Sequence, residues 1–140
     1  HNLVDRCDVG KAVRTLMDSV GLASGFAKKY PHEFSGGQRQ RIAIGRAIAT
    51  KPEFIVADEP VSALDVTIQA QILKLLAELK EEYGITMLFV SHDLAVIRQI
   101  SDRVAVMFAG QLEEIGPTKT VFDHPQSAYT RNLLESIPAR

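Results

Sequence analysis

The chain has 140 residues, a formal net charge of −1 and 46% hydrophobic residues. This length suits one globular domain with a real core, and the balanced charge excludes a strongly basic surface of the kind that binds nucleic acid. The single cysteine, Cys7, excludes an internal disulfide, and neither a signal peptide nor an apolar run of the ~20 residues that span a bilayer is present. We expect a soluble cytoplasmic α/β domain and, because the first residue is not Met, a processed or partial product.

The first part of the chain is predicted to contain one amphipathic helix and a connector. Residues 8–20 carry apolar side chains at helical spacing, with Asp8 as the expected N-cap and Gly21 as the expected stop. A short helical piece over residues 26–30 follows, and Pro31 should end it.

The pair Gly10-Lys11 raises the question of a phosphate-binding loop. That motif needs a glycine five places before its second glycine, and a Ser or Thr after its lysine. Asp5 and Ala12 occupy those positions, and no strand precedes them. We therefore reject this site and expect Lys11 to be a solvated helix residue.

A tandem glycine at the start of the next predicted helix offers a candidate anion site. Ser35 is the expected N-cap, and Gly36 and Gly37 leave bare backbone N–H groups at the positive end of the helix dipole. Without side chains, the two glycines would let a phosphate approach closely. The alternative on these residues alone is an ordinary Ser-capped helix with a flexible Gly-Gly entry. The helix should end at Lys51-Pro52.

A short apolar strand that ends in two acids is the central chemical signal of the chain. Residues 54–57 are apolar with β-branched members, which predicts a strand buried on both faces, as in a parallel sheet under helices. Asp58 and Glu59 stand at its carboxyl end, where open α/β sheets bind ligands. Pro60 biases Glu59 toward an extended backbone. Two adjacent acids in that place need a cation or a proton-transfer role.

A long helix and a second strand come next. Residues 66–83 have the pattern of a helix, with Asp65 as its N-cap and Gly84 as its stop. The apolar run 86–90 predicts the second strand. The expected buried stripe of the helix comprises Ile68, Ile72, Leu75, Leu76, Leu79 and Tyr83.

One histidine follows the second strand at its carboxyl end. His92 precedes a predicted helix over residues 94–100. Because strand ends of a parallel sheet meet at one edge, we expect His92 in the layer that holds Asp58 and Glu59. A lone histidine is usually structural or exposed, and this shared placement is what favours a functional role.

The C-terminal region is predicted to form a hairpin and two short helices. Residues 104–108 and 112–115 have the spacing of two paired strands, and residues 116–117, Gly-Pro, should end the second one. Short helices are expected near Val121 and over residues 129–136.

Four motifs together resemble those of ABC-type ATPase domains. They are the signature sequence at residues 34–38, the Walker B strand with its glutamate at residues 54–60, the D-loop at residues 62–65, and the switch histidine His92. Four motifs in the right order and spacing make a chance match very improbable. The resemblance implies a P-loop NTPase-like α/β fold that hydrolyses ATP with Mg²⁺.

The wider sequence resembles the ATPase subunits of bacterial oligopeptide and dipeptide importers. The similar stretches are residues 30–41, residues 63–72, and residues 129–134 followed by 137–138. Ser127-Ala128 departs from the His-Pro often found there, and importers of nickel, glutathione or glycan fragments share these features. The alternative is a non-transport ABC ATPase of DNA repair or translation, although the short helical region before Phe34 lacks the coiled-coil insertion that is usual there.

One expected motif is absent, since no Gly-x-x-x-x-Gly-Lys-Ser/Thr occurs in the 140 residues. The resemblance therefore implies the C-terminal part of one ATPase domain, which would not hydrolyse ATP alone. Its expected parts are a helical subdomain with the signature over about residues 1–38, a core over residues 39–117 and a helical tail over residues 118–140.

The resemblance also assigns roles to individual residues. Asp58 would hold Mg²⁺ through water, and Glu59 would orient or deprotonate the attacking water. His92 would contact the γ-phosphate and sense its loss. The signature residues, which would cap the γ-phosphate of a nucleotide held by the opposite subunit, are Ser35, Gly36, Gly37 and Gln38. Asp65 would lie at the seam of that dimer.

The implied partners follow from these roles. They are ATP, Mg²⁺, a second ABC ATPase domain in a homodimer or heterodimer, a transmembrane permease and, indirectly, an extracytoplasmic solute-binding protein. No nucleic acid is expected. The implied location is the cytoplasmic face of the cell membrane, where the subunit would be peripheral.

Overall fold

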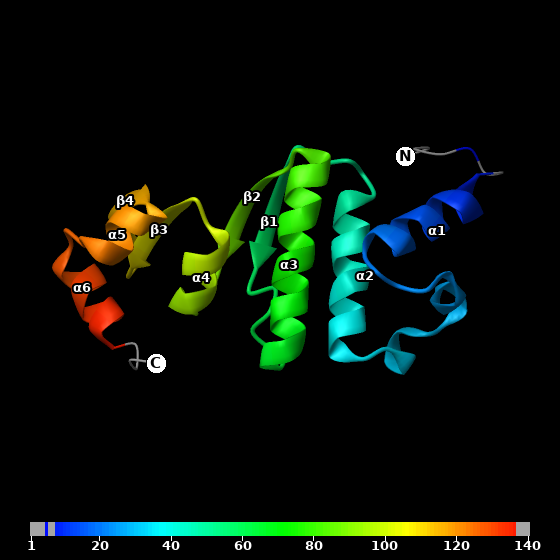
Figure 1. Ribbon diagram of the computed structural model, residues 1–140, viewed down its shortest axis with the longest axis horizontal. Coiled ribbons are helices and arrows are strands. Elements are labelled where there is room, and N and C mark those ends of the chain that lie inside the picture. Colours follow the sequence, from blue (N-terminus) through cyan, green and yellow to red (C-terminus); the bar gives the residue numbers. More distant parts are fainter. Residues whose placement is uncertain (1–4, 6–7, 137–140) are drawn as a thin grey trace. The chain divides into compact units, whose positions relative to one another are not determined.

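The computed structural model describes residue 5 and residues 8–136, and the chain divides into two compact units, His1–Leu88 and Phe89–Arg140 (Figure 1). Cys7 and residues 137–138, to which the sequence analysis referred, lie outside the described residues. Among the described residues, no helix is both long and apolar enough to cross a bilayer. The boundaries expected near residues 38 and 117 stay predictions.

The first unit contains helices and the start of a sheet, in the order that the sequence predicted. Its elements are α1 (Val9–Ser19), the 3-10 helices η1 (Ser24–Lys28) and η2 (Pro31–Glu33), α2 (Gly36–Ile48), β1 (Phe54–Asp58), α3 (Val66–Tyr83) and the first residues of β2 (Thr86–Val90). Strands β1 and β2 are neighbours in a parallel pair connected through α3. The helices and strands expected over residues 8–20, 54–57, 66–83 and 86–90 are confirmed. Two local expectations are wrong, because Asp8 makes no side-chain cap hydrogen bond and Pro31 begins η2 instead of ending a helix.

Helices α1, α2 and α3 pack in sequence order, with α2 in contact with both of the others (Figure 1). The guanidinium Nη1 of Arg41 in α2 donates a hydrogen bond of 2.7 Å to the carbonyl oxygen of Val20, just after α1. Gly21, with φ +68°, ends α1 as expected. The buried apolar residues of this unit are Val20, Leu22, Phe34, Ile44, Ile48, Ala57, Val61, Ile72, Leu73, Leu75, Leu76, Leu79 and Ile85.

Strand β1 is buried on one face only, so the expectation of two-sided burial is wrong. Ala57 is buried, whereas Phe54 and Val56, which point to the other face, are 54% and 57% exposed. Side chains alternate between faces along a strand, and α3 supplies a covering layer on one side alone. The continuous apolar run therefore predicted a strand correctly. It did not predict that one face of this strand is exposed within the described residues.

The second unit contains α4 (Leu94–Ile100), β3 (Arg103–Phe108), β4 (Gln111–Pro117), α5 (Thr118–Asp123) and α6 (Ala128–Glu135). Strands β3 and β4 form the predicted antiparallel hairpin, whose turn has positive φ at Ala109 and Gly110. Strand β4 does end at the Gly-Pro pair, but it includes both residues and so runs two residues past the expected end, to Pro117 opposite Arg103. Proline is tolerated there because β4 is an edge strand of its two-stranded sheet.

Helix α6 is attached to the hairpin through the carboxylate of Glu114. Glu114 accepts hydrogen bonds from the backbone N–H groups of Gln126 at 2.9 Å and Ser127 at 3.1 Å. The ring of Tyr129 lies 4.4 Å from that of Phe108. The N–H of Gln126, followed by weaker donors, holds the pKa of Glu114 below its ordinary value because these donors favour the charged carboxylate.

We predict that acid weakens the attachment of α6 through Glu114. A carboxyl whose pKa is lower in the folded state contributes stability above its unfolded pKa, and this contribution is lost as the pH falls through the folded pKa. Glu114→Gln should therefore be less stable than the parent protein at pH 7, and the difference should shrink near pH 3, as measured by thermal melting. Glu53→Gln, at an exposed glutamate just before β1 in the other unit, is the matched control. A difference that stays constant with pH would contradict the assignment.

Candidate functional site

The start of α2 has the geometry of a capping box around Ser35. Ser35 has φ −65° and ψ 164°, its Oγ accepts the N–H of Gln38 at 3.3 Å, and its own N–H donates to Gln38 Oε1 at 3.0 Å. The predicted N-cap is confirmed. The N–H groups of Gly36 and Gly37 come next, and the first N–H groups of a helix have no acceptor within it. Ser35 and Gly36 are exposed, so this helix end is accessible to an anion.

The glycine at position 37 allows α2 and α3 to pack closely, which the sequence did not predict. A Cβ atom on Gly37 would lie 2.5 Å from Cγ2 of Ile68 in α3, a separation that real Cβ atoms do not show. At Gly36 the corresponding distance, to Cδ2 of Leu64, is an ordinary 3.4 Å. The missing side chain at position 37 thus serves the close approach of two helices, whatever else approaches it.

The start of α3 lies beside the start of α2 and is also capped. Asp65 has φ −66° and ψ 158°, and its Oδ1 accepts the N–H of Ile68 at 3.0 Å, which confirms the predicted N-cap. Since Ile68 and Leu64 flank this cap and contact the two glycines, the structure brings the signature residues and the D-loop together. Both motifs belong to the first unit.

The two acids follow β1 in different surroundings. Asp58 is the last residue of β1 and is exposed, while Oε2 of Glu59 is shielded from solvent. Glu59 has φ +46°, so the expected extended backbone is wrong. Pro60 disfavours the right-handed helical region for its predecessor. The turn closed by Ser62, whose Oγ donates to the carbonyl oxygen of Glu59 at 3.1 Å, selects the left-handed region.

A left-handed glutamate is uncommon and costs about 1–3 kcal/mol, and such strain clusters at functional sites. Lys51 and Ala109 also have a positive φ, so the strain at Glu59 does not by itself indicate a functional residue. Within the described part of the chain, no group of three or more His, Cys, Asp or Glu side chains is placed to hold a metal ion. A cation at Asp58 would need further ligands, such as water and phosphate oxygens.

His92 is exposed and is placed by the turn that starts α4. The N–H of Asp93 donates to Ser91 Oγ at 3.0 Å, and Asp93 Oδ1 accepts the N–H groups of Ala95 at 2.9 Å and Val96 at 3.3 Å. His92 belongs to the second unit and the two acids to the first. Its expected place in their layer stays a prediction.

Two features of the site were not recognised in the sequence. The partner of Ser35 in the capping box is Gln38, and the spacing Ser-x-x-Gln is a known signal for this cap. Ile68, the neighbour of Gly37, is 31 residues away in the chain. Ile68 and Tyr83 were both predicted on the buried stripe of α3, but Ile68 is only half-buried and Tyr83 is exposed. No local pattern indicates which glycine Ile68 meets.

Comparisons with known proteins define the class. Residues 5–62 match the ABC transporter family. A solved ATP-binding cassette of an ABC transporter, MJ1267 in its ADP conformation, superposes with a TM-score of 0.76 at 31% identity over 92% of this chain and 51% of that one. The predicted fold class is confirmed, because the chain has the fold of part of an ATP-binding cassette, and its sequence is similar to the ABC transporter family over residues 5–62.

The chain is similar in sequence to proteins that are named as ATP-binding proteins of importers. The chain is 55% identical over 99% of its length to the glutathione import ATP-binding protein GsiA of Pectobacterium atrosepticum, and covers 22% of that protein. It is 53% identical, again over 99% of its length, to the oligopeptide transport ATP-binding protein AppF of Bacillus subtilis, and covers 42% of it. The predicted resemblance to peptide importers is confirmed, and the chain spans less than half of these relatives.

We predict that the cap on α3 stabilises the junction of the two motifs. Asp65→Ala should lower the free energy of unfolding by about 0.5–2 kcal/mol because the N–H of Ile68 loses its acceptor. Asp65→Asn, which keeps a side-chain oxygen at the cap, should lose much less. Chemical denaturation of the three proteins measures both values, and equal losses in the two variants would show that the cap is not the cause.

Proposed function

We propose that this chain is part of the ATP-binding subunit of an ABC importer that takes up peptides or peptide-like solutes, and that ATP hydrolysis powers the uptake. The support is the similarity to GsiA and AppF, whose names state glutathione import and oligopeptide transport. Nearly every residue of the chain takes part in both alignments. Copurification with a permease from membranes tests this function, and stable binding to ribosomes or DNA would favour the non-transport alternative instead.

The observation that carries the proposal is the exposed, Ser-capped start of α2 beside the start of α3. In the proposed dimer, Ser35, Gly36, Gly37 and Gln38 bind the γ-phosphate of a nucleotide held by a second ABC ATPase domain. Two unpaired N–H groups and the positive end of the helix dipole suit that anion. Asp65 then lies at the dimer seam. The second domain is either another copy or a related subunit.

Asp58 and Glu59 are the proposed hydrolytic residues. Mg²⁺ prefers oxygen ligands, keeps several waters and commonly binds through one or two carboxylates together with substrate phosphates. The exposed carboxylate of Asp58 fits that chemistry, and a bound Mg²⁺ would neutralise phosphate charge. Glu59 orients or deprotonates the attacking water, and the turn at φ +46° fixes where its side chain starts. His92 contacts the γ-phosphate.

The phosphate-binding loop and the membrane-spanning parts of the transporter are proposed to lie outside these 140 residues. The 140 residues contain no Gly-x-x-x-x-Gly-Lys-Ser/Thr loop, so we propose that this chain does not hydrolyse ATP alone. The working subunit sits peripherally on the cytoplasmic face of the membrane and drives transmembrane permease subunits. It acts indirectly on an extracytoplasmic solute-binding protein and has no role with nucleic acid.

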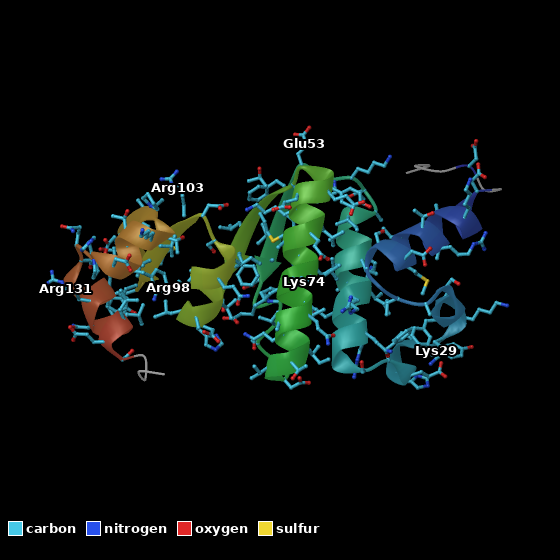
Figure 2. All side chains as sticks on the ribbon, in the orientation of Figure 1. Lys29, Glu53, Lys74, Arg98, Arg103 and Arg131 are labelled. Atoms are coloured by element: carbon cyan, nitrogen blue, oxygen red, sulfur yellow. The ribbon has the colours of Figure 1, made fainter. Side chains whose placement is uncertain are left out.

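We predict that Glu59→Gln in the complete subunit leaves ATP binding largely intact and abolishes most turnover. Loss of a positioned general base typically lowers the rate by about 10²–10⁴-fold. Steady-state phosphate release and equilibrium ATP binding measure the two effects. Glu53→Gln is the matched control, because Glu53 is an exposed glutamate just before β1, at the end of the strand away from the two acids (Figure 2). Unchanged turnover in Glu59→Gln would remove this residue from the catalytic role.

We predict that Ser35→Arg blocks transport. The substitution places bulk and charge where the helix start would meet a phosphate, and it removes the acceptor for the N–H of Gln38. Uptake of a labelled peptide into vesicles, together with ATP-dependent dimerisation of the isolated subunits, measures the effect. Ser24→Arg, at an exposed serine that starts η1, is the control for the added charge. Normal transport by Ser35→Arg would contradict the anion site.

A further inference from the structure

We propose that Ile68 is a positioning residue for the start of α2, and that residue 37 is a glycine because Ile68 occupies the space next to it. This inference rests on the proposed function, in which the start of α2 receives a phosphate. It differs from the usual explanation of a tandem glycine at such a place, which is room for the phosphate itself. In this chain the space beside Gly37 is already filled by protein.

The contact is close and specific. A Cβ on Gly37 would meet Cγ2 of Ile68 at 2.5 Å, Cβ at 3.8 Å and Cδ1 at 4.0 Å, so one methyl group accounts for the clash. Ile68 cannot easily swing this methyl away, because a β-branched side chain in a helix has one strongly preferred χ1 rotamer. Nor can its backbone move freely, since Asp65 Oδ1 holds the Ile68 N–H at 3.0 Å.

The same helix shows that glycines of α2 are not all alike. Gly45 is also within α2, and a Cβ there would lie 3.5 Å from Val20 Cγ1, which is ordinary van der Waals contact. At Gly36 the nearest atom is Leu64 Cδ2 at 3.4 Å. Among these three glycines, a side chain at position 37 alone forces a displacement of one helix against the other.

A rigid junction has a functional consequence. Because Asp65 caps the turn that carries Ile68, and Ile68 sets the position of Gly37, the seam residue and the phosphate-binding N–H groups belong to one packed body. A displacement of about 1 Å at a binding group can cost about 10²-fold in rate. Ile68 therefore acts on the proposed site through Gly37 and does not itself touch the nucleotide.

A size exchange between positions 37 and 68 in the complete subunit tests this. Gly37→Ala should cause a clear loss of the dimerisation induced by a non-hydrolysable ATP analogue, because the added Cβ displaces the start of α2 against Ile68. Adding Ile68→Ala removes the obstructing methyl and should restore most of the dimerisation. Adding Ile68→Val instead should not restore dimerisation, because valine keeps a methyl group at the position of the obstructing Cγ2. Analytical ultracentrifugation measures dimerisation, and Gly45→Ala is the control for alanine within α2.

The outcomes separate this inference from the proposed function. If Ser35→Arg leaves dimerisation intact, the anion site in the proposed function is contradicted. If Ser35→Arg abolishes dimerisation but Gly37→Ala/Ile68→Ala is no better than Gly37→Ala, the glycine serves the ligand directly and only the present inference is overturned. Undiminished dimerisation in Gly37→Ala also overturns it. If Gly37→Ala does not fold, recovered folding in the double variant counts as the rescue, and continued failure contradicts it.

Discussion

The junction between the first turns of α2 and α3 is the constraint on which the rest of the candidate site depends. One methyl group of Ile68 fills the space where a side chain of residue 37 would otherwise lie. Gly37 and Ile68 are both half-buried, and a side chain at position 37 would clash with a carbon next to the backbone of α3, so one of the two helices would have to shift. Both helices begin at this point, each with its own cap. The positions of Ser35 and Asp65 are therefore not independent of each other.

Glu59 illustrates a second constraint, in which the backbone and not packing sets the geometry. The chain leaves β1, turns within a few residues and enters α3, and it does so with a positive φ at a residue that is not glycine. Glycine would accept this conformation without strain. Lys51 and Ala109 share this conformation, so the proposed role of Glu59 rests on its place directly after β1 and not on the strain alone.

The sequence predicted nearly every element because helix starts and stops are marked by local chemistry. Asp65 and Gly84 lie directly before the first and directly after the last residue of α3, as predicted. Ser35 is the residue directly before α2. The errors arose where a distant part of the chain decides. The exposure of Val56 depends on which layers cover β1, and the role of Gly37 depends on a side chain 31 residues away. A single sequence contains no local trace of either fact.

The backbone of Glu59 was missed for a different reason, since proline restricts its predecessor without choosing one remaining region. The turn closed by Ser62 made that choice. The order and spacing of the motifs predict the candidate residues and their chemistry from the sequence alone. The sequence does not predict which side chain lies next to which glycine, or which helix caps lie at the same junction. The structure shows both.

The identity of the two caps completes the physical case for different roles of the two helix starts. Ser35 satisfies an N–H group with a neutral oxygen, and the first turn of α2 contains no acidic residue. The positive end of its dipole is thus left for an external anion. Asp65 satisfies the equivalent group in α3 with a carboxylate, which already compensates that dipole. An aspartate at position 35 would cap α2 as well as serine does, but it would repel a phosphate. The neutral cap of α2 therefore suits the proposed phosphate site, and the charged cap of α3 suits a position beside it that binds no anion.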